Sequence, residues 1–310
     1  MNAMLKKNYN LFSGHLKQLF GHRVHKISVD AGMTCPNRAG TRSEPGCIFC
    51  DREGSGAVGI ERTLPVAEQI EQGKEVMTRK YKAGQFLAYF QPFSNTNAPV
   101  ADLRRLYDEA LSVDNVVGLS VGTRPDCLPG DVLDLLAEYH QRTYLWLEIG
   151  LQSTHDSSLD FIRRGHDYAL FLQAFKAAKK RNLQVCVHVI LGLPGEDRRA
   201  MLATADELAR LKVDGVKIHL LHVLRGTTLG DLYERGEVEV LTQDDYVSLA
   251  VDFIERLHPE TLIHRLTGDG PRDILLAPLW SLNKWEVINA IDDEFTRRNS
   301  FQGYRYNDPS

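Results

Sequence analysis

The amino-acid sequence predicts an α/β fold, a partial (β/α)6 TIM-like barrel with N-terminal and C-terminal extensions. Strand-like and helix-like segments alternate from about residue 25 to about residue 260, which implies a parallel sheet joined by crossover helices. Several strand segments are apolar on one face and small or polar on the other. A sheet between two helix layers would be apolar on both faces, so the polar face indicates a lumen that holds a ligand. The active site is then expected at the carboxyl ends of the strands.

Six strands are expected, and the segments between them have helical periodicity. The strands span residues 26–31, 86–91, 116–121, 145–151, 184–191 and 215–220. Most strand–helix repeats take roughly 30–40 residues, whereas the first takes about 60, so an insertion is expected after the first strand.

Alternation along the last three strands supplies candidate lumen residues. These are Trp146, Glu148, Gly150 and, just beyond the strand, Gln152; then Gln184, Cys186 and His188; then Lys217 and His219. Glu148 is a carboxylate on this face, and an ion pair with Arg124 or Lys217 is its structural interpretation.

Three regions are expected along the chain. Residues 1–24 form a basic N-terminal extension, residues 25–258 the barrel, and residues 259–310 a C-terminal strand and helix that pack on it. A seventh strand and a turn are expected within 262–270, and a closing helix over 284–298. This helix could cover the barrel mouth as a lid, or its apolar stripe could simply pack on the core.

Composition limits the class of protein. The 310 residues are 43% hydrophobic and 25% charged, with a formal net charge of −4, which is ordinary for a globular protein and unlike a polycation that coats nucleic acid. No apolar run reaches the ~20 residues that span a bilayer, and the first twenty residues are too polar for a signal peptide. A cytoplasmic location is therefore expected.

The N-terminal segment is the exception to the mild acidity. Residues 1–26 contain no Asp or Glu, and their cations are Lys6, Lys7, Lys17, Arg23 and Lys26. A solvated amphipathic helix would explain this pattern, and so would a basic surface that binds a polyanion such as RNA.

A cysteine-containing loop follows the first strand. Cys35, Cys47 and Cys50 have the spacing C-x11-C-x2-C, and the close pair is of the kind that grips one metal centre. Three thiolates without a fourth nearby leave one iron of a [4Fe–4S] cluster open to a substrate or cofactor. A zinc site of three cysteines and one histidine is the competing interpretation, although the loop contains no His. Cys127 and Cys186 are expected to be small packing residues, with Cys186 the better functional candidate.

At this loop the chain resembles the radical S-adenosylmethionine (SAM) superfamily, although the usual spacing there is C-x3-C-x2-C. A longer first gap occurs in the Elongator-type catalytic subunit. Within the superfamily the chain looks most like the YhcC/YtqA-type proteins, and the resemblance covers roughly residues 20–280. The motifs that carry it are CPNRAGT (35–41), GTRPD (122–126), WLEIGLQS (146–153), RRGH (163–166), VCVHVILGLPGE (185–196) and KIHLLHVLRGT (217–227).

The resemblance implies a [4Fe–4S] cluster, SAM, reductive cleavage of SAM to a 5′-deoxyadenosyl radical, and an electron donor such as flavodoxin or ferredoxin. It also implies SAM contacts for six residues, namely Phe49, Gln91, Glu148, Gln152, Arg164 and His188. Phe49 matches the aromatic position beside the adenine, and Arg164 matches a basic residue that meets the SAM carboxylate. Some relatives have Asp at the position of His188. Gln91 stands in place of a glycine-rich motif for the SAM amino group.

The substrate implied by the resemblance is tRNA, because Elongator-type enzymes modify the wobble uridine and members of the smaller family have been linked to the same side chain. Radical chemistry on a small metabolite or a protein is one alternative. A non-enzymatic, metal-containing RNA-binding module is another, and it would need no polar lumen.

Overall fold

The computed structural model describes residues 7–39, 46–54, 61–268 and 270–308, and the chain divides into two compact units. The N-terminal unit comprises residues 16–151 and 163–187, and the C-terminal unit comprises residues 1–15, 152–162 and 188–310. Strand β5 (Gln184–Leu191) gives its first half to the N-terminal unit and its second half to the C-terminal unit.

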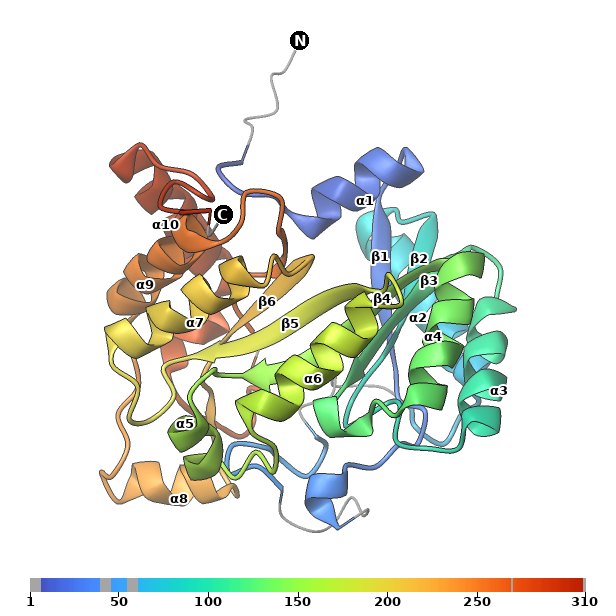
Figure 1. The fold of residues 1–310 in the computed structure, drawn as a ribbon, viewed down its shortest axis with the longest axis horizontal. Coiled ribbons are helices and arrows are strands. Elements are labelled where there is room, and N and C mark those ends of the chain that lie inside the picture. The colour runs from blue at the N-terminus through green and yellow to red at the C-terminus, as the bar shows by residue number, and fades with distance from the viewer. Residues whose placement is uncertain (1–6, 40–45, 55–60, 269, 309–310) are drawn as a thin grey trace. The chain divides into compact units, whose positions relative to one another are not determined.

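The N-terminal unit contains a sheet in the order β1-β2-β3-β4-β5, and its pairings from β1 through β4 are parallel. The strands are β1 (Val24–Val29), β2 (Gln85–Phe90), β3 (Val116–Thr123), β4 (Tyr144–Gln152) and the first half of β5. The helices are α2 (Val66–Tyr81), α3 (Val100–Leu111), α4 (Gly130–Arg142) and α6 (Tyr168–Lys179), with 3-10 turns η1 (Pro36–Arg38) and η2 (Pro125–Cys127) after β1 and β3. Helix α1 (Phe12–Phe20) is divided between the units after His15. Helix α2 packs on β1 and α3 on β3 (Figure 1).

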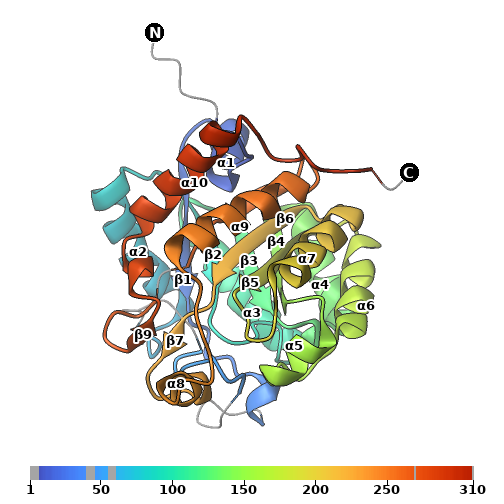
Figure 2. The same ribbon diagram turned by 90° about the vertical axis from the view of Figure 1, so that its left-hand side faces the viewer.

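In the C-terminal unit the sheet continues from β5 to β6 (Gly215–Leu220) and β8 (Leu262–Arg265), and β6 pairs with β8 in parallel. Helix α7 (Arg198–Arg210) packs on α9 (Gln243–Arg256), which packs on α10 (Lys284–Arg298), and Figure 2 shows these helices side by side. The shorter elements are α5 (Asp156–Phe161), α8 (Thr228–Glu234), η3 (Leu279–Leu282), and an antiparallel pair formed by β7 (Val223–Leu224) and β9 (Leu275–Ala277).

Local sequence explains where several helices begin. Each of Asp167, Asp197, Thr227 and Thr242 accepts a hydrogen bond from a backbone N–H in the first turn of the helix that follows it. Such caps satisfy donors that have no partner within the helix, so these side chains fix the starts of α6 to α9.

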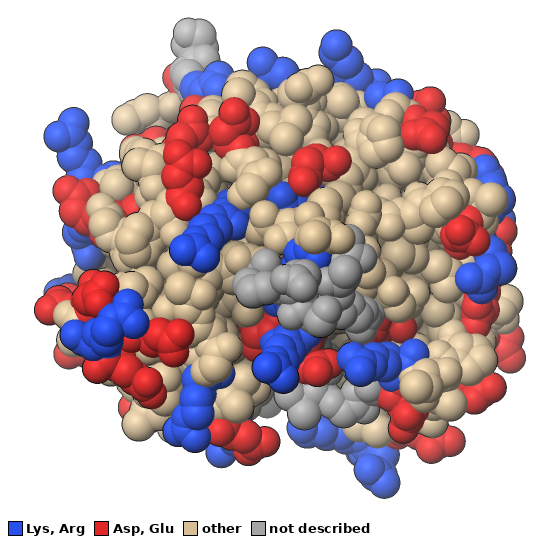
Figure 3. Space-filling view, turned by 90° about the horizontal axis from the view of Figure 1, so that it is seen from below, with Lys and Arg blue, Asp and Glu red and all other residues tan. Residues whose placement is uncertain are grey.

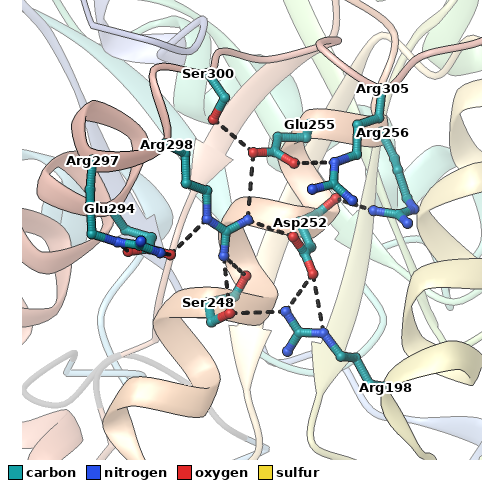
Figure 4. Close-up of polar contacts among 10 residues, drawn as sticks. All are labelled: Arg198, Ser248, Asp252, Glu255, Arg256, Glu294, Arg297, Arg298, Ser300 and Arg305. Carbon is teal, nitrogen blue, oxygen red and sulfur yellow. Dashed lines mark hydrogen bonds and ion pairs between the residues drawn. The ribbon is translucent and has the colours of Figure 1, made fainter.

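Arginines and carboxylates hold the outer helices of the C-terminal unit together (Figure 4). Arg298 of α10 lies 2.5 Å from Asp252 of α9 and 2.6 Å from Glu294, and Arg198 of α7 also bonds Asp252. After α10, Arg305 and Ser300 both bond Glu255 at 2.7 Å. The network therefore joins α7, α9, α10 and the C-terminal segment.

The predicted fold class is confirmed, and all six predicted strands are present. Strand β1 begins and ends two residues earlier than predicted, because the Asp30 backbone N–H donates to Gln69 Oε1 and its side chain accepts from the Gly32 N–H, which ends the strand. The predicted seventh strand is β8. It joins the same sheet, which therefore has seven strands instead of six.

The predicted closing helix has the observed bounds of α10. It packs on α9 and buries Val287, Ile291 and Phe295, whereas Trp285 is 73% exposed. These contacts are those of the packing interpretation. Within the described residues, no helix has the length and apolar character required to cross a membrane.

Candidate active site

Three thiols lie on the loop that follows β1. Cys35 is half-buried and precedes η1, Cys47 is buried, and Cys50 closes a tight turn in which its N–H donates to Cys47 O at 3.0 Å. Residues 40–45, within the long gap between Cys35 and Cys47, lie outside the described part of the chain. One loop at the carboxyl end of one strand therefore supplies all three thiols.

Side chains of the N-terminal unit donate hydrogen bonds to two of these sulfurs. Arg38 Nη2 lies 3.1 Å from Cys50 Sγ, Asn37 Nδ2 lies 3.4 Å from Cys47 Sγ, and Arg164 Nη1 lies 3.6 Å from Cys47 Sγ. Donors of this kind stabilise a metal-bound thiolate. The segment around the thiols therefore supplies hydrogen bonds to sulfurs that ligate a metal.

Three buried arginines lie in the thiol loop or in the same unit. Arg38, Arg124 and Arg164 are 3%, 3% and 8% exposed, and buried guanidinium groups require polar partners. Arg124 forms a two-point ion pair with Asp126 at 2.8 and 2.9 Å and donates to Arg164 O at 2.7 Å. The Arg124 pKa is raised despite burial, by Asp126 and by the charges of Cys35 and Cys47.

Burial and Arg38 act in opposite directions on the Cys50 thiol. The Cys50 pKa is raised to about 11, first by burial and also by the Cys47 and Asp51 charges, while the charge and hydrogen bond of Arg38 act to lower it. At neutral pH this thiol is therefore protonated until a metal displaces the proton, so metal binding releases protons.

The RRGH segment is tied to both the thiol loop and β4. Asn37 Nδ2 donates to Arg163 O at 2.7 Å, and Arg164 Nη2 donates to Gly150 O at 2.8 Å. Gly165 has a φ of +75°, and a Cβ there would lie 2.3 Å from Asn37 Oδ1. Only glycine allows this close approach. The buried Arg164 Nε has no hydrogen-bond partner, which leaves one donor of the guanidinium for a ligand.

On the polar face of the same sheet, Glu148 is fully buried and forms an ion pair with Lys26 of β1. Ser120 of β3 donates a hydrogen bond to the same carboxylate. Lys26 also lies 4.8 Å from the centre of the Tyr89 ring, and the Cys186 sulfur lies within 4.8 Å of a Glu148 oxygen. The polar lumen face that strand alternation predicts is therefore present in this unit.

Comparison with known proteins assigns the family. The model of the radical SAM superfamily matches residues 34–208, and that of the Radical_SAM C-terminal domain matches residues 213–297. The chain is 47% identical over 298 residues to the uncharacterized protein YtqA of Bacillus subtilis, which covers 96% of this chain and 92% of YtqA.

The chain belongs to the radical SAM superfamily.

Protein YhcC of Escherichia coli is 41% identical over 289 residues, covering 93% of this radical SAM chain and 92% of YhcC. Among solved structures, the archaeal Methanocaldococcus infernus Elp3 with an N-terminal deletion has a TM-score of 0.70 and 15% identity, and covers 90% of this chain and 64% of its own. This likeness concerns the fold. Elongator complex protein 3 of Dictyostelium discoideum is 31% identical over 193 residues, which covers 61% of this chain and 34% of that protein. The resemblances to the YhcC/YtqA-type proteins and, over part of the chain, to the Elongator subunit are thus confirmed.

A [4Fe–4S] cluster and SAM are the cofactors of this radical SAM enzyme, and the residues around the loop fit them. Three thiols match a cluster with one open iron, and sulfur-directed N–H donors and buried guanidinium groups suit an anionic assembly. The unused donor on Arg164 suits a carboxylate. No His of the described loop competes as a fourth ligand, which disfavours the structural zinc interpretation.

The structure brings some predicted SAM contacts to the thiol loop's own unit and not others. Phe49 lies half-buried between Cys47 and Cys50, and Gln91 follows β2 and donates to Ser28 Oγ at 2.9 Å. Gln152 and His188 belong to the C-terminal unit. Gln152 ends β4 with a φ of +83°, and the His188 ring lies 5.3 Å from that of His219.

The ion pair expected as an alternative role of Glu148 is present, but its partner is Lys26. The Arg124 guanidinium pairs with Asp126, two residues further along the chain at the start of η2. Lys26 is not part of a basic surface. Strand alternation turns it to the sheet's polar face, where it pairs with Glu148.

Sequence reasoning missed Asn37 and Arg38, which donate to the sulfurs. Both follow Cys35 directly in the segment CPNR, so proximity to the first ligand was the available signal. Phe93 was missed as well, and its ring lies 5.4 Å from the Arg38 guanidinium. Loop side chains have no periodicity from which their direction can be read.

Proposed function

We propose that this radical SAM enzyme modifies tRNA at the side chain of the wobble uridine, with Cys35, Cys47 and Cys50 holding three irons of the cluster. The observation that carries the site assignment is the convergence of donors from Asn37, Arg38 and Arg164 on the sulfurs of this loop. When bound, the cluster and SAM supply a 5′-deoxyadenosyl radical that abstracts a hydrogen atom.

The chain's own residues have positioning roles in this proposal. Arg164 uses its unpartnered Nε–H, together with its positive charge, to hold the SAM carboxylate. Phe49 packs on the adenine, and Gln91 and Gln152 contact the polar part of SAM. Glu148 accepts a hydrogen bond from a ribose hydroxyl beside its ion pair with Lys26. His188 contacts SAM from β5. Flavodoxin or ferredoxin serves as the electron donor.

The tRNA assignment rests on resemblance to Elongator-type proteins, and the charge of the surface supports it only locally. Figure 3 shows Lys and Arg side chains interspersed with Asp and Glu, without a broad field of one sign on that face. Lys17 and Arg23 are exposed, whereas Lys7 pairs with Asp292 and Lys26 is turned to the lumen. Lys6 lies outside the described residues.

This pairing of two N-terminal cations favours one alternative, a small metabolite or a protein as the substrate. The two substrates can be separated by binding. If tRNA is the substrate, the affinity should fall with added salt, and changing Lys17 and Arg23 to Gln should weaken binding and flatten the salt slope, because each phosphate contact releases counterions. If this variant binds tRNA with wild-type affinity, the N-terminal segment is not part of the RNA site.

The decisive experiment is mass spectrometry of tRNA nucleosides from a strain that lacks the gene. The proposal predicts that one wobble-uridine derivative disappears and that its precursor accumulates. Complementation with the wild-type gene should restore the product, and complementation with a Cys47→Ala gene should not. Unchanged nucleosides would promote the small-molecule or protein alternative.

A further inference from the structure

The inward face of the C-terminal unit gathers basic side chains on three neighbouring strands. Lys217 and His219 alternate onto one face of β6, and Lys217 lies in register with Arg265 of β8. His188 comes from β5, and its ring centre lies 5.3 Å from that of His219. Lys217 is only 4% exposed, so its side chain lies deep in this face.

The loop after β8 adds a close backbone approach to this cluster. A Cβ on the buried Gly268 would lie 3.2 Å from His222 Cε1 and 3.6 Å from His219 Nδ1. The imidazoles of His219 and His222 therefore lie next to the backbone of Gly268, where a side chain would crowd them. Glycine keeps the space beside the rings open.

Basic groups are frequent on the strands of the cluster. The sequences of β5, β6 and β8 contain Lys217, Arg265 and three histidines but no Asp or Glu. The pKa of His219 is well below its usual value, first through burial and then through the charges of His188, Arg265, Lys217 and His222. At neutral pH the His219 imidazole is therefore neutral and can donate one hydrogen bond beside Lys217 and Arg265.

We propose that Lys217, His219, His222 and Arg265 bind an oxyanion of the substrate, either a carboxylate or a phosphate group. Lysine supplies a point charge, arginine a planar pair of donors, and the imidazoles neutral donors, a combination that suits oxyanions. This inference deepens the proposed function, on which it rests, by assigning an anionic group to the molecule that enters the lumen.

Binding of simple anions tests the site without turnover. Inorganic phosphate and acetate are titrated separately into the cofactor-loaded full chain under anaerobic conditions, by calorimetry and by nitrogen NMR of the histidines. The site predicts saturable binding and a rise of the His219 pKa, because a bound anion stabilises the imidazolium. Preference for phosphate assigns the substrate group as a phosphate, and preference for acetate assigns it as a carboxylate.

Variants locate the binding. Lys217→Gln and Arg265→Gln should each weaken the preferred anion about tenfold or more, since each removes a charge-assisted contact. Lys217→Arg and Arg265→Lys should retain most of the affinity for the anion. These charge-conserving variants test the site if a Gln variant fails to fold. Arg235→Gln is the matched control, because Arg235 belongs to the same unit but is exposed and paired with Glu237.

Two results would overturn the site, namely no saturable binding of either anion by the wild type, or equal affinity in the wild type and both Gln variants. Failure of the proposed tRNA function has a different signature. In that case the anion affinities would follow the predictions above, while the tRNA nucleosides of the deletion strain would be unchanged.

Discussion

Arginine clusters in both units of the chain, but its partners differ. In the C-terminal unit, Arg198 and Arg298 meet the carboxylates of Asp252 and Glu294 (Figure 4). In the N-terminal unit, Arg38 and Arg164 donate to cysteine sulfurs and backbone carbonyl oxygens. The first arrangement neutralises its own charges, whereas in the second Arg164 keeps one donor, Nε, without a partner.

The pKa values of the acidic groups differ between the two clusters. Hydrogen bonds from Arg297 and Arg298 lower the pKa of Glu294 to about 2 against the effect of burial, so this carboxylate is charged at neutral pH and the network is complete without a ligand. Around the thiols, burial instead raises the pKa of Cys50 to about 11. The comparison teaches that buried arginine indicates a ligand site only where carboxylates do not already satisfy it.

The largest expected effect concerns the cysteines. Replacing Cys35, Cys47 or Cys50 with Ala should abolish a cluster of about four irons and four sulfides per chain, because each variant removes one of three ligands. Iron and sulfide analysis after anaerobic reconstitution measures this. Cys127→Ala is the control and should keep the cluster, since Cys127 is a buried thiol that follows β3. A full cluster in any of the three ligand variants would move the ligand assignment elsewhere.

The next effect concerns SAM. Arg164→Ala should weaken SAM binding roughly ten- to a hundredfold at unchanged iron content, because a charge-assisted contact is worth about 1.5–3 kcal/mol. Calorimetry on the reconstituted protein gives the affinity. Arg163→Ala, at the exposed neighbouring position, should bind SAM normally. Equal SAM affinities for the wild type and Arg164→Ala would contradict the role of this guanidinium.

A smaller effect is expected from the self-neutralised network. Arg298→Ala should lower the free energy of unfolding by about 1–3 kcal/mol, because Asp252 and Glu294 lose a partner while Asp252 keeps Arg198. Arg297→Ala should cost less than about 1 kcal/mol, since its side chain is exposed. Urea unfolding checks both. Loss of SAM binding in Arg298→Ala without loss of stability would break the distinction between the two clusters.

The smallest effect concerns cluster assembly. Arg38 lowers the Cys50 pKa, so Arg38→Gln should raise it further and leave less thiolate at neutral pH. Cluster yield at pH 7 should fall a few-fold and recover at higher pH, since ligation requires loss of the thiol proton. Reconstitution yield across a pH series measures this, and a yield that depends on pH identically in both proteins would contradict it.

Most of the fold could be predicted because strand alternation and helical periodicity are local signals. The bounds of α10 and of β5 and β6 follow from such patterns, and the thiol loop follows from its spacing. The partner of Glu148 could not be predicted, because Lys26 reaches it only through the register of β1 to β4. Arg38 was missed for a related reason, since loop conformation sets its direction.

The division of the chain at residues 24 and 258 and the individual SAM contacts stay predictions. The central claim joins them, namely that the thiol loop holds a cluster with one iron open to SAM beside Arg164. Electron–nuclear double resonance of the reduced, reconstituted protein with nitrogen- and oxygen-labelled SAM tests it most directly. The claim predicts coupling of the amino nitrogen and carboxylate oxygen of SAM to the cluster. An intact cluster without such coupling in the presence of saturating SAM would contradict it.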